Sequence, residues 1–316
     1  MLLFAPKASL ALGSRIAEAL GVSLSPSEER EFDGGEHKMR PLVDVCNEYV
    51  YVVQSLCGDA SASANDKLCR LLFFVGALKD AGARHVTVVA PYLAYARKDR
   101  RTQPRDPVTT RYVATLLEAV DVDRTITLEI HNEAAFDNAF RRHTIRLEAS
   151  DVFAERIAEK VADQPVVVMS PDIGGVKRAQ RLRECLVRTL SREVDLAFME
   201  KRRASGVVSG DAVVGELSGR AVVVYDDMIV SGSTILRACQ AARQANGTAV
   251  YVAAAHAAFQ PSAMELFETR VADDVLVTDS IPLRPEFSGW LGAGLHVCSL
   301  APLVARTIQS LERDRR

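Results

Sequence analysis

Residues 222–235 read Val222-Val223-Val224-Tyr225-Asp226-Asp227-Met228-Ile229-Val230-Ser231-Gly232-Ser233-Thr234-Ile235. The four apolar or aromatic residues at the start are typical of a buried parallel strand. Two carboxylates follow, then a turn of small residues, then a helix that begins near Ile235. Backbone N–H groups and hydroxyls at a helix N-terminus can hold a phosphate, and neighbouring carboxylates suit sugar hydroxyls or a metal-bound sugar. Acidic strand ends also occur without function, but strand, acids and small turn together predict a pocket for a phosphorylated sugar.

Length and composition set the broad class. The 316 residues suffice for two domains, and 48% hydrophobic with 25% charged residues describe a soluble globular protein. A net charge of -2 gives no reason to expect nucleic acid or a membrane as partner, and no apolar run is long enough to span a bilayer. The six cysteines form no CxxC pair, so we expect most to be small buried residues in a cytoplasmic protein with reduced thiols.

Strands alternate with helices along the whole chain. This pattern predicts an α/β fold with mainly parallel sheets, in two domains. A polar and basic stretch between Arg141 and Ser150 is the expected boundary, which gives domains 1–145 and 146–316. The expected strands are 2–6, 49–54, 85–91, 125–131, 165–169, 195–199, 222–225, 249–255, 274–278 and 295–299, and the expected helices include 10–21, 66–81, 109–120, 235–245 and 300–311.

Three further strand ends carry candidate functional residues. The basic segment 97–107 contains two prolines, so we expect a loop that binds polyphosphate at the carboxyl end of a strand. Glu129 and His131 would point to one face of a strand and converge on a cation. Segment 170–178 combines Asp172, two glycines and two basic residues at a strand-to-helix turn, which favours phosphate or sugar contacts.

These motifs together resemble the ribose-phosphate diphosphokinase family over nearly the whole chain. The sugar-phosphate stretch itself is similar to the phosphoribosyl-diphosphate loop of type I phosphoribosyltransferases. The resemblance implies two tandem phosphoribosyltransferase-type (Rossmann-like) domains, Mg2+ as cofactor, and a homo-oligomer active in nucleotide biosynthesis, with ATP bound partly by a neighbouring subunit. It implies transfer of the diphosphoryl group of ATP to the 1-hydroxyl of ribose 5-phosphate, with AMP released. Its collinear motifs are Phe32–Glu36, Asn65-Asp66, Tyr95-Ala96-Arg97, Asp99-Arg100, 129–131, 170–175, 201–203 and 226–234.

The resemblance also implies residue roles. Lys201 and Arg203 match the family's catalytic Lys-x-Arg pair and would stabilise charge on the transferring group. His131 and Asp172 would help to place magnesium, with Glu129 a weaker candidate. The expected ATP-binding residues are Phe32, stacking on adenine, with Glu36, Arg97 and Arg100. The expected ribose 5-phosphate-binding residues are Asp226, Asp227, Ser231, Gly232, Ser233 and Thr234.

Several positions depart from the family pattern, mostly on the nucleotide and metal side. Gly34 stands where the adenine turn usually carries an aspartate, and Glu129 also replaces an aspartate. Lys98 replaces a glutamine, Val230 stands where many members have a third acid, and the usual Gly-Phe-Phe-x-x-Pro segment after His131 is absent. Two alternatives follow: a non-catalytic regulatory homologue, or a phosphoribosyltransferase that uses phosphoribosyl diphosphate.

Overall fold

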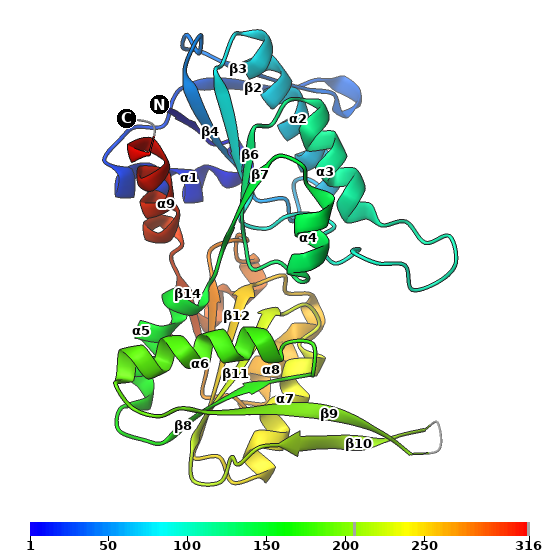
Figure 1. The fold of residues 1–316 in the computed structure, drawn as a ribbon, viewed down its shortest axis with the longest axis vertical. Coiled ribbons are helices and arrows are strands. Elements are labelled where there is room, and N and C mark those ends of the chain that lie inside the picture. The colour runs from blue at the N-terminus through cyan, green and yellow to red at the C-terminus, as the bar shows by residue number, and fades with distance from the viewer. Residues whose placement is uncertain (205–206, 315–316) are drawn as a thin grey trace. The chain divides into compact units, whose positions relative to one another are not determined.

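The chain forms two compact units, each built around its own parallel sheet (Figure 1). This computed structural model describes the backbone of residues 1–204 and 207–314 and, within them, the side chains outside 201–211. Unit 1 comprises Met1–Leu147 and the chain from Leu300 onward, and unit 2 comprises Glu148–Ser299. The predicted fold class, α/β with mainly parallel sheets, is confirmed.

Unit 1 contains a five-stranded sheet in the order β1-β4-β5-β6-β7, with every neighbouring pair parallel. A separate antiparallel hairpin pairs β2 with β3. Parallel neighbours need long crossover connections, which the helices supply. The elements of unit 1 are β1 (Leu2–Phe4), α1 (Leu10–Leu20), β2 (Ser27–Glu31), β3 (His37–Pro41), β4 (Tyr49–Val53), α2 (Ala64–Asp80), β5 (His85–Val89), α3 (Thr109–Ala119), β6 (Arg124–Leu128), α4 (Glu133–Ala139), β7 (His143–Leu147) and α9 (Ala301–Arg313).

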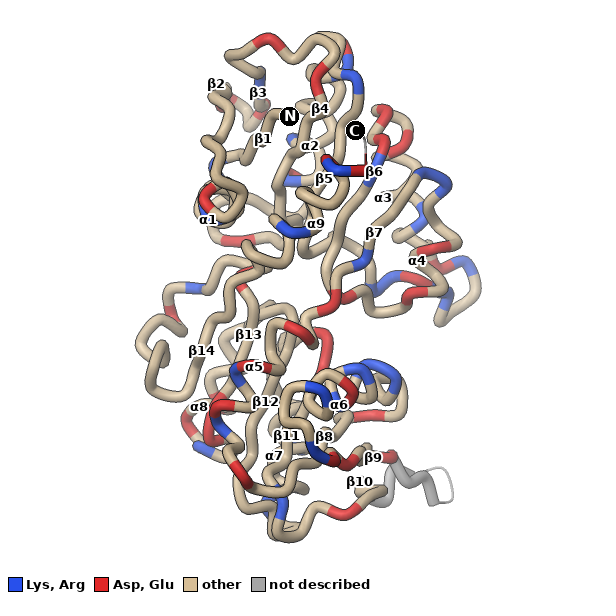
Figure 2. Tube along the Cα trace, turned by 60° about the vertical axis from the view of Figure 1, so that its left-hand side comes forward, with Lys and Arg blue, Asp and Glu red and all other residues tan. Residues whose placement is uncertain are grey.

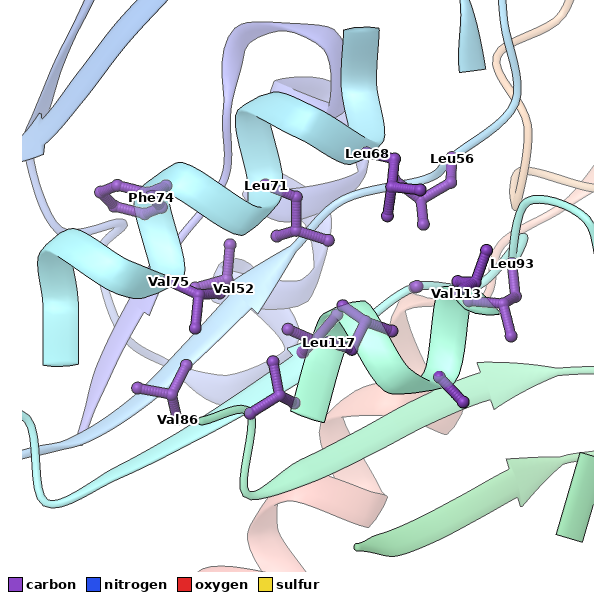
Figure 3. Packing of buried hydrophobic residues seen from close by; sticks show 14 of the residues in the cluster. Val52, Leu56, Leu68, Leu71, Phe74, Val75, Val86, Leu93, Val113 and Leu117 are labelled. Carbon is purple, nitrogen blue, oxygen red and sulfur yellow. The ribbon is translucent and has the colours of Figure 1, made fainter. Parts of the chain in front are cut away.

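Helices cover both faces of this sheet. Successive residues of β4 point to opposite faces, so Val50 and Val52 pack in a cluster with α2 and α3 (Figure 3). Tyr51 between them is fully buried, and its hydroxyl donates to Glu312 of α9 at 2.8 Å. Because Tyr51 bonds to α9, the last helix of the chain belongs to the core of the first unit. Burial of a valine such as Val50 or Val52 stabilises the fold by about 1.5–3 kcal/mol.

Helix α2 begins two residues earlier than the sequence pattern suggested. Ser63 Oγ accepts a hydrogen bond from Asp66 N at 3.1 Å, and the Asp66 carboxylate accepts one from Ser63 N at 2.8 Å. This reciprocal capping satisfies two N–H groups at the start of the helix and extends it to Ala64.

Unit 2 contains a seven-stranded sheet in the order β10-β9-β8-β11-β12-β13-β14. In the described part of this sheet, only β10 runs antiparallel to its neighbour. The strand that carries the two acids, β11, lies at the centre of the sheet and continues through them to Met228, so the acids do not follow the strand as the sequence pattern predicted. The elements of unit 2 are α5 (Ser150–Val161), β8 (Val166–Ser170), α6 (Val176–Leu190), β9 (Asp195–Ala204), β10 (Val207–Val214), β11 (Ala221–Met228), α7 (Ser233–Gln244), β12 (Ala249–His256), α8 (Met264–Glu268), β13 (Asp274–Thr278) and β14 (Leu295–Cys298).

Strand β11 is buried on both faces, as its continuous apolar run predicted. Val222 and Val224 pack in one cluster with α7 residues. Tyr225 points to the other face, where its ring meets that of Phe153 on α5 edge-on with centroids 6.0 Å apart. Because β11 is packed on both faces and hydrogen-bonded to a strand on each side, it gives rigid support to the turn that leads into α7.

The domain boundary differs from the expected one in two respects. The expected division at 145/146 falls inside β7, which pairs with β6 from His143 to Leu147 and so belongs to unit 1. The chain from Leu300 onward, expected in the second domain, belongs to unit 1 because α9 packs against α1 and receives the Tyr51 hydrogen bond. The order of elements along the sequence does not indicate that the C-terminal helix packs in unit 1.

Two composition-based expectations can also be compared with the structure. All six cysteines are free, but only Cys185, Cys239 and Cys298 are buried, so the expectation that most are buried is wrong. Among the described residues, no helix combines the length and apolar character needed to cross a membrane.

Candidate active site

The central feature of unit 2 is the carboxylate pair at the end of β11. Asp226 and Asp227 come after five fully buried strand residues, and their side chains are about 20% and 5% exposed. The Asp226 carboxylate accepts a hydrogen bond from the Asp227 backbone N–H at 2.8 Å. Two carboxylates in so little water repel one another and need an opposing charge.

Arg178 of α6 supplies that charge. Its guanidinium lies 3.2 Å from Asp226 Oδ1 and 3.7 Å from Asp227 Oδ2, and the side chain is only 11% exposed. Burial and then the charge of Asp227 raise the pKa of Asp226 to about 7, against the lowering effect of Arg178. Asp226 therefore exchanges a proton near neutral pH, and a bound cation or sugar hydroxyl would change its protonation.

The turn after the carboxylates leads directly into α7. Gly232 is the N-cap residue and has φ 79°, a left-handed conformation that favours glycine. Ser231 and Ser233 are exposed, and their hydroxyl oxygens lie 3.0 Å apart. Thr234 is half-buried in the first turn of the helix. These hydroxyls and the helix N-terminus place hydrogen-bond donors at one turn, and their binding of an anion stays a prediction.

The neighbouring strand β8 ends in a second turn at the same edge of the sheet. β8 runs parallel to β11, so their carboxyl ends meet at one edge. Asp172 is exposed; its Oδ1 accepts a hydrogen bond from Gly175 N at 2.9 Å. Gly175 allows close packing, because a Cβ there would lie 2.6 Å from Ser170 Oγ. Helix α6 then begins, and Figure 2 shows Lys and Arg gathered along it. Of its first two basic residues, Lys177 is exposed, whereas Arg178 contacts the carboxylate pair.

In unit 1 the expected adenine turn is the tip of the β2–β3 hairpin. Phe32 is 47% exposed, Glu36 is exposed, and Phe32 N donates to Glu36 O at 2.8 Å. Gly34 has φ 84° with nothing within 4 Å of a Cβ built there. An aspartate at this position would be strained by φ but would have room, so the substitution leaves open space at the tip. Phe32 thus offers an accessible ring face, while no carboxylate stands at position 34.

The basic segment in unit 1 is a loop, as the prolines predicted. Arg97 and Arg100 are exposed at its start. The loop is anchored by Asp99, whose carboxylate accepts a hydrogen bond from Asn132 Nδ2 at 2.6 Å, and by Thr110, whose hydroxyl donates to Tyr95 O at 2.9 Å. Both guanidinium groups are therefore available to an anion on an otherwise tethered loop.

The predicted convergence of Glu129 and His131 is wrong. Strand β6 ends at Leu128, and Glu129 has φ 39°, so the alternation of a strand no longer applies. Glu129 is buried and His131 exposed, so the two side chains differ in environment. In place of the family's usual segment, Asn132 caps the short helix α4, and Phe136 of that helix is fully buried. Of this pair, His131 is the exposed side chain.

Lys201 and Arg203 were expected to act in catalysis. They belong to β9, but their side chains lie outside the described residues. Their role stays a prediction from the sequence.

Sequence reasoning missed the role of Arg178. The pattern of segment 170–178 predicts phosphate or sugar contacts for its two basic residues, yet Arg178 pairs with the two acids of β11. A signal existed: Arg178 occupies the same stripe of α6 as the buried residues Leu182 and Leu186, where a cation needs a buried partner. Asn132 was also missed, because its bond to Asp99 joins segments distant in sequence.

Comparison with known proteins gives matches along nearly the entire chain. Residues 1–120 match the model of the N-terminal domain of ribose phosphate pyrophosphokinase, and residues 138–275 match that of the phosphoribosyl transferase domain. A ribose-phosphate pyrophosphokinase of Pasteurella multocida is 33% identical over 321 residues, and one of Vibrio parahaemolyticus is 34% identical over 316 residues. Each alignment covers 99% of this chain and 96% of the relative. The crystal structure of phosphoribosylpyrophosphate synthetase from Mycobacterium smegmatis is similar with a TM-score of 0.87 and 30% identity over 99% of each chain.

Proposed function

The chain belongs to the ribose-phosphate pyrophosphokinase family, and on that premise we propose that it transfers the diphosphoryl group of ATP to the 1-hydroxyl of ribose 5-phosphate. The products are phosphoribosyl diphosphate and AMP. The observation that carries this proposal is the buried carboxylate pair of β11, followed after a short turn by a glycine-capped helix N-terminus. That arrangement suits a sugar that carries both hydroxyls and a phosphate.

On the ribose side, the 5-phosphate binds the turn between β11 and α7. Its oxygens accept hydrogen bonds from the hydroxyls of Ser231, Ser233 and Thr234 and from N–H groups at the helix start, while Gly232 lets the backbone approach. Asp226 and Asp227 accept hydrogen bonds from the ribose hydroxyls. Holding the sugar in this way orients its anomeric hydroxyl for attack on the β-phosphorus.

On the nucleotide side, Phe32 stacks on the base and Glu36 lines the same hairpin tip. Arg97 and Arg100 bind the phosphates, for which exposed guanidinium groups on a tethered loop are suited. Lys201 and Arg203 stabilise the charge that develops on the transferring group. Phosphoryl-type transfer depends on such positioning and charge stabilisation more than on covalent catalysis.

Magnesium is the proposed cofactor. Among the described residues no group of three or more histidines, cysteines or acids could hold a metal ion. Proteins usually bind Mg2+ through one or two carboxylates together with substrate phosphates. As the family resemblance implies, His131 and Asp172 are the side chains proposed to help place Mg2+, which would neutralise phosphate charge when bound. We further propose homo-oligomeric assembly and a cytoplasmic location, on the strength of the family alone.

The test is to incubate the chain with ATP, Mg2+ and ribose 5-phosphate and to follow AMP and phosphoribosyl diphosphate together. Equal amounts of both support diphosphoryl transfer. ADP in place of AMP would mean that a single phosphoryl group moves, which contradicts the proposal. Ribose 5-phosphate binding without turnover would instead support a regulatory homologue.

Three variants assign the roles. Lys201→Ala should lower kcat by two orders of magnitude or more with ribose 5-phosphate affinity retained, since its contact forms in the transition state. Replacing both Asp226 and Asp227 by asparagine should weaken ribose 5-phosphate binding instead. Asp195→Asn is the matched control, because Asp195 pairs with Arg220 at the start of β9, at the opposite edge of the same sheet.

A further inference from the structure

His256 is a buried histidine at the end of β12, beside the strand that carries the two acids. It is 2% exposed, and its Nδ1 lies 2.9 Å from the hydroxyl oxygen of Ser280, which is itself fully buried. The Ser280 hydroxyl also lies within hydrogen-bond distance of Ala255 O, at 3.1 Å. The His256 ring is therefore hydrogen-bonded to a buried hydroxyl that is itself tied to the backbone of β12, which holds the ring in place.

The backbone of His256 is joined to the chain that follows Asp227. Met228 is its register partner on β11, and His256 O accepts a hydrogen bond from Ile229 N at 3.0 Å. The ring and the backbone of one residue thus link the core around Ser280 to the start of the turn that leads into α7.

The segment after His256 then runs along that turn. Gln260 N donates to Val230 O at 2.9 Å, and Ser262 Oγ lies 3.5 Å from Ser231 O. A Cβ added at Gly232 would lie 3.3 Å from Ala263 Cα, so the two backbones are close there. Residues 256–263 therefore form a wall against residues 229–232, and this wall begins at His256.

We propose that His256 is a positioning residue for ribose 5-phosphate: its bond to Ser280 holds the wall 256–263, and through it the turn 229–232, in the geometry that binds the 5-phosphate. This inference rests on the proposed function, because it assigns the phosphate to that turn. His256 itself does not touch the substrate. A displaced turn would weaken hydrogen bonds to the phosphate, since these depend on distance and angle.

The test compares His256→Leu with His256→Asn in the full chain. The asparagine side-chain amide can form a hydrogen bond to Ser280 from close to where Nδ1 stands, whereas leucine can form none. For ribose 5-phosphate, measured by calorimetry, we expect His256→Leu to weaken binding roughly tenfold and His256→Asn to stay within about threefold of the parent. Ser280→Ala should weaken it as His256→Leu does, and the double variant should be no worse than either single one.

A matched control is His296→Leu. His296 Nε2 lies 2.7 Å from Asp274 Oδ1 near the starts of β14 and β13, so this variant also loses a histidine hydrogen bond but at the opposite edge of the sheet. It should leave ribose 5-phosphate affinity unchanged. In steady state, His256→Leu should raise the KM for ribose 5-phosphate while the KM for ATP stays the same.

Three results would overturn the proposal: unchanged affinity in His256→Leu, equal loss in His256→Asn, or a parallel loss of ATP affinity. Should His256→Leu fail to fold, Ser280→Ala and His256→Asn still give the comparison. Absence of AMP formation by the parent chain would contradict the proposed function, whereas the binding comparison does not depend on turnover.

Discussion

Arg178 is the residue on which the carboxylate pair depends. With the guanidinium removed, as in Arg178→Gln, Asp226 and Asp227 would face one another in a buried setting without an opposing charge. We expect the free energy of unfolding to fall by about 3 kcal/mol, because breaking a buried ion pair leaves an uncompensated charge. Urea unfolding at pH 8 measures it.

A neighbour on the same helix provides the control. Arg181 lies 3.3 Å from Glu148, but both side chains are substantially exposed. Arg181→Gln should cost less than about 1 kcal/mol, as surface pairs usually do. Equal losses in the two variants would mean that the carboxylate pair does not need Arg178.

Asp226 introduces a pH dependence of stability. Its pKa is raised to about 7 in the folded chain, chiefly by burial and by Asp227, so the folded state binds the proton more tightly than the unfolded state. Its stabilising contribution is therefore full below pH 4 and is lost as the pH rises to 7. The difference in the free energy of unfolding between Asp226→Asn and the parent should therefore rise, in favour of the variant, by about 2–4 kcal/mol between pH 4 and pH 8. Urea titrations across this range measure the difference, and a constant difference would refute the assignment.

At the scale of elements, the junction between β11 and α7 depends on Gly232. Gly232→Ala introduces a side chain at φ 79° and 3.3 Å from Ala263 Cα. We expect a loss of about 1 kcal/mol in stability from the left-handed conformation, and at least tenfold weaker ribose 5-phosphate binding because the turn must shift.

Gly219→Ala separates the two effects. Gly219 has φ 71° but nothing within 4 Å of an added Cβ. The Gly219→Ala variant should lose about as much stability as Gly232→Ala but keep its affinity for ribose 5-phosphate. Thermal unfolding measures the stability, and titration calorimetry measures the affinity. Unchanged ribose 5-phosphate binding in Gly232→Ala would argue against a role for the turn.

The loop that carries Arg97 and Arg100 is tied to another element by Asn132. Asn132 donates to Asp99 and also accepts a hydrogen bond from Ala135 N as the cap of α4. Asn132→Ala should cost about 1 kcal/mol through the cap and raise the KM for ATP several-fold, with that for ribose 5-phosphate unchanged. Steady-state kinetics with each substrate varied in turn measure the two KM values.

Asn138 lies on the same helix and donates to Ala134 O at 2.7 Å. Asn138→Ala should leave both KM values as they are. If the two variants behave alike, the tether to Asp99 has no part in ATP binding.

At the scale of the whole molecule, the two units have separate cores, but the chain returns to the first one at its end. A chain that stops at Ser299 would lose the buried Val304 and Ile308 of α9 and the partner of Tyr51. We expect unit 1 to lose at least about 4 kcal/mol of stability, and unit 2 to keep its own. Hydrogen exchange should increase in β4 and stay unchanged in β11.

A chain that ends at Glu312 is the control, because it keeps the buried residues of α9 and the Tyr51 hydrogen bond. Faster exchange in β11 of the shorter chain would show that the two cores are not independent.

Local features of the site could be predicted from the sequence because the interacting groups are close along the chain. Strand, acids, turn and helix follow one another between Val222 and Ile235 as the apolar run and the small residues predicted, although β11 continues through both acids to Met228 and α7 begins at Ser233. The proline-containing loop after Arg97 and the exposed ring of Phe32 follow from equally local patterns. The departure of Glu129 from the strand did not, because its left-handed backbone depends on what packs around it.

What the sequence by itself determined was the alternation of strands and helices, the strand-to-helix turn with its two acids, and the residue types that fit a sugar phosphate. Only the tertiary structure decided which groups from distant segments meet. It paired Arg178 with both acids of β11, linked Asn132 to Asp99, and returned the last helix to the first unit. The physical reason is that backbone geometry and hydrophobic period act over a few residues, whereas buried charges and helix faces find partners wherever the packed fold places them.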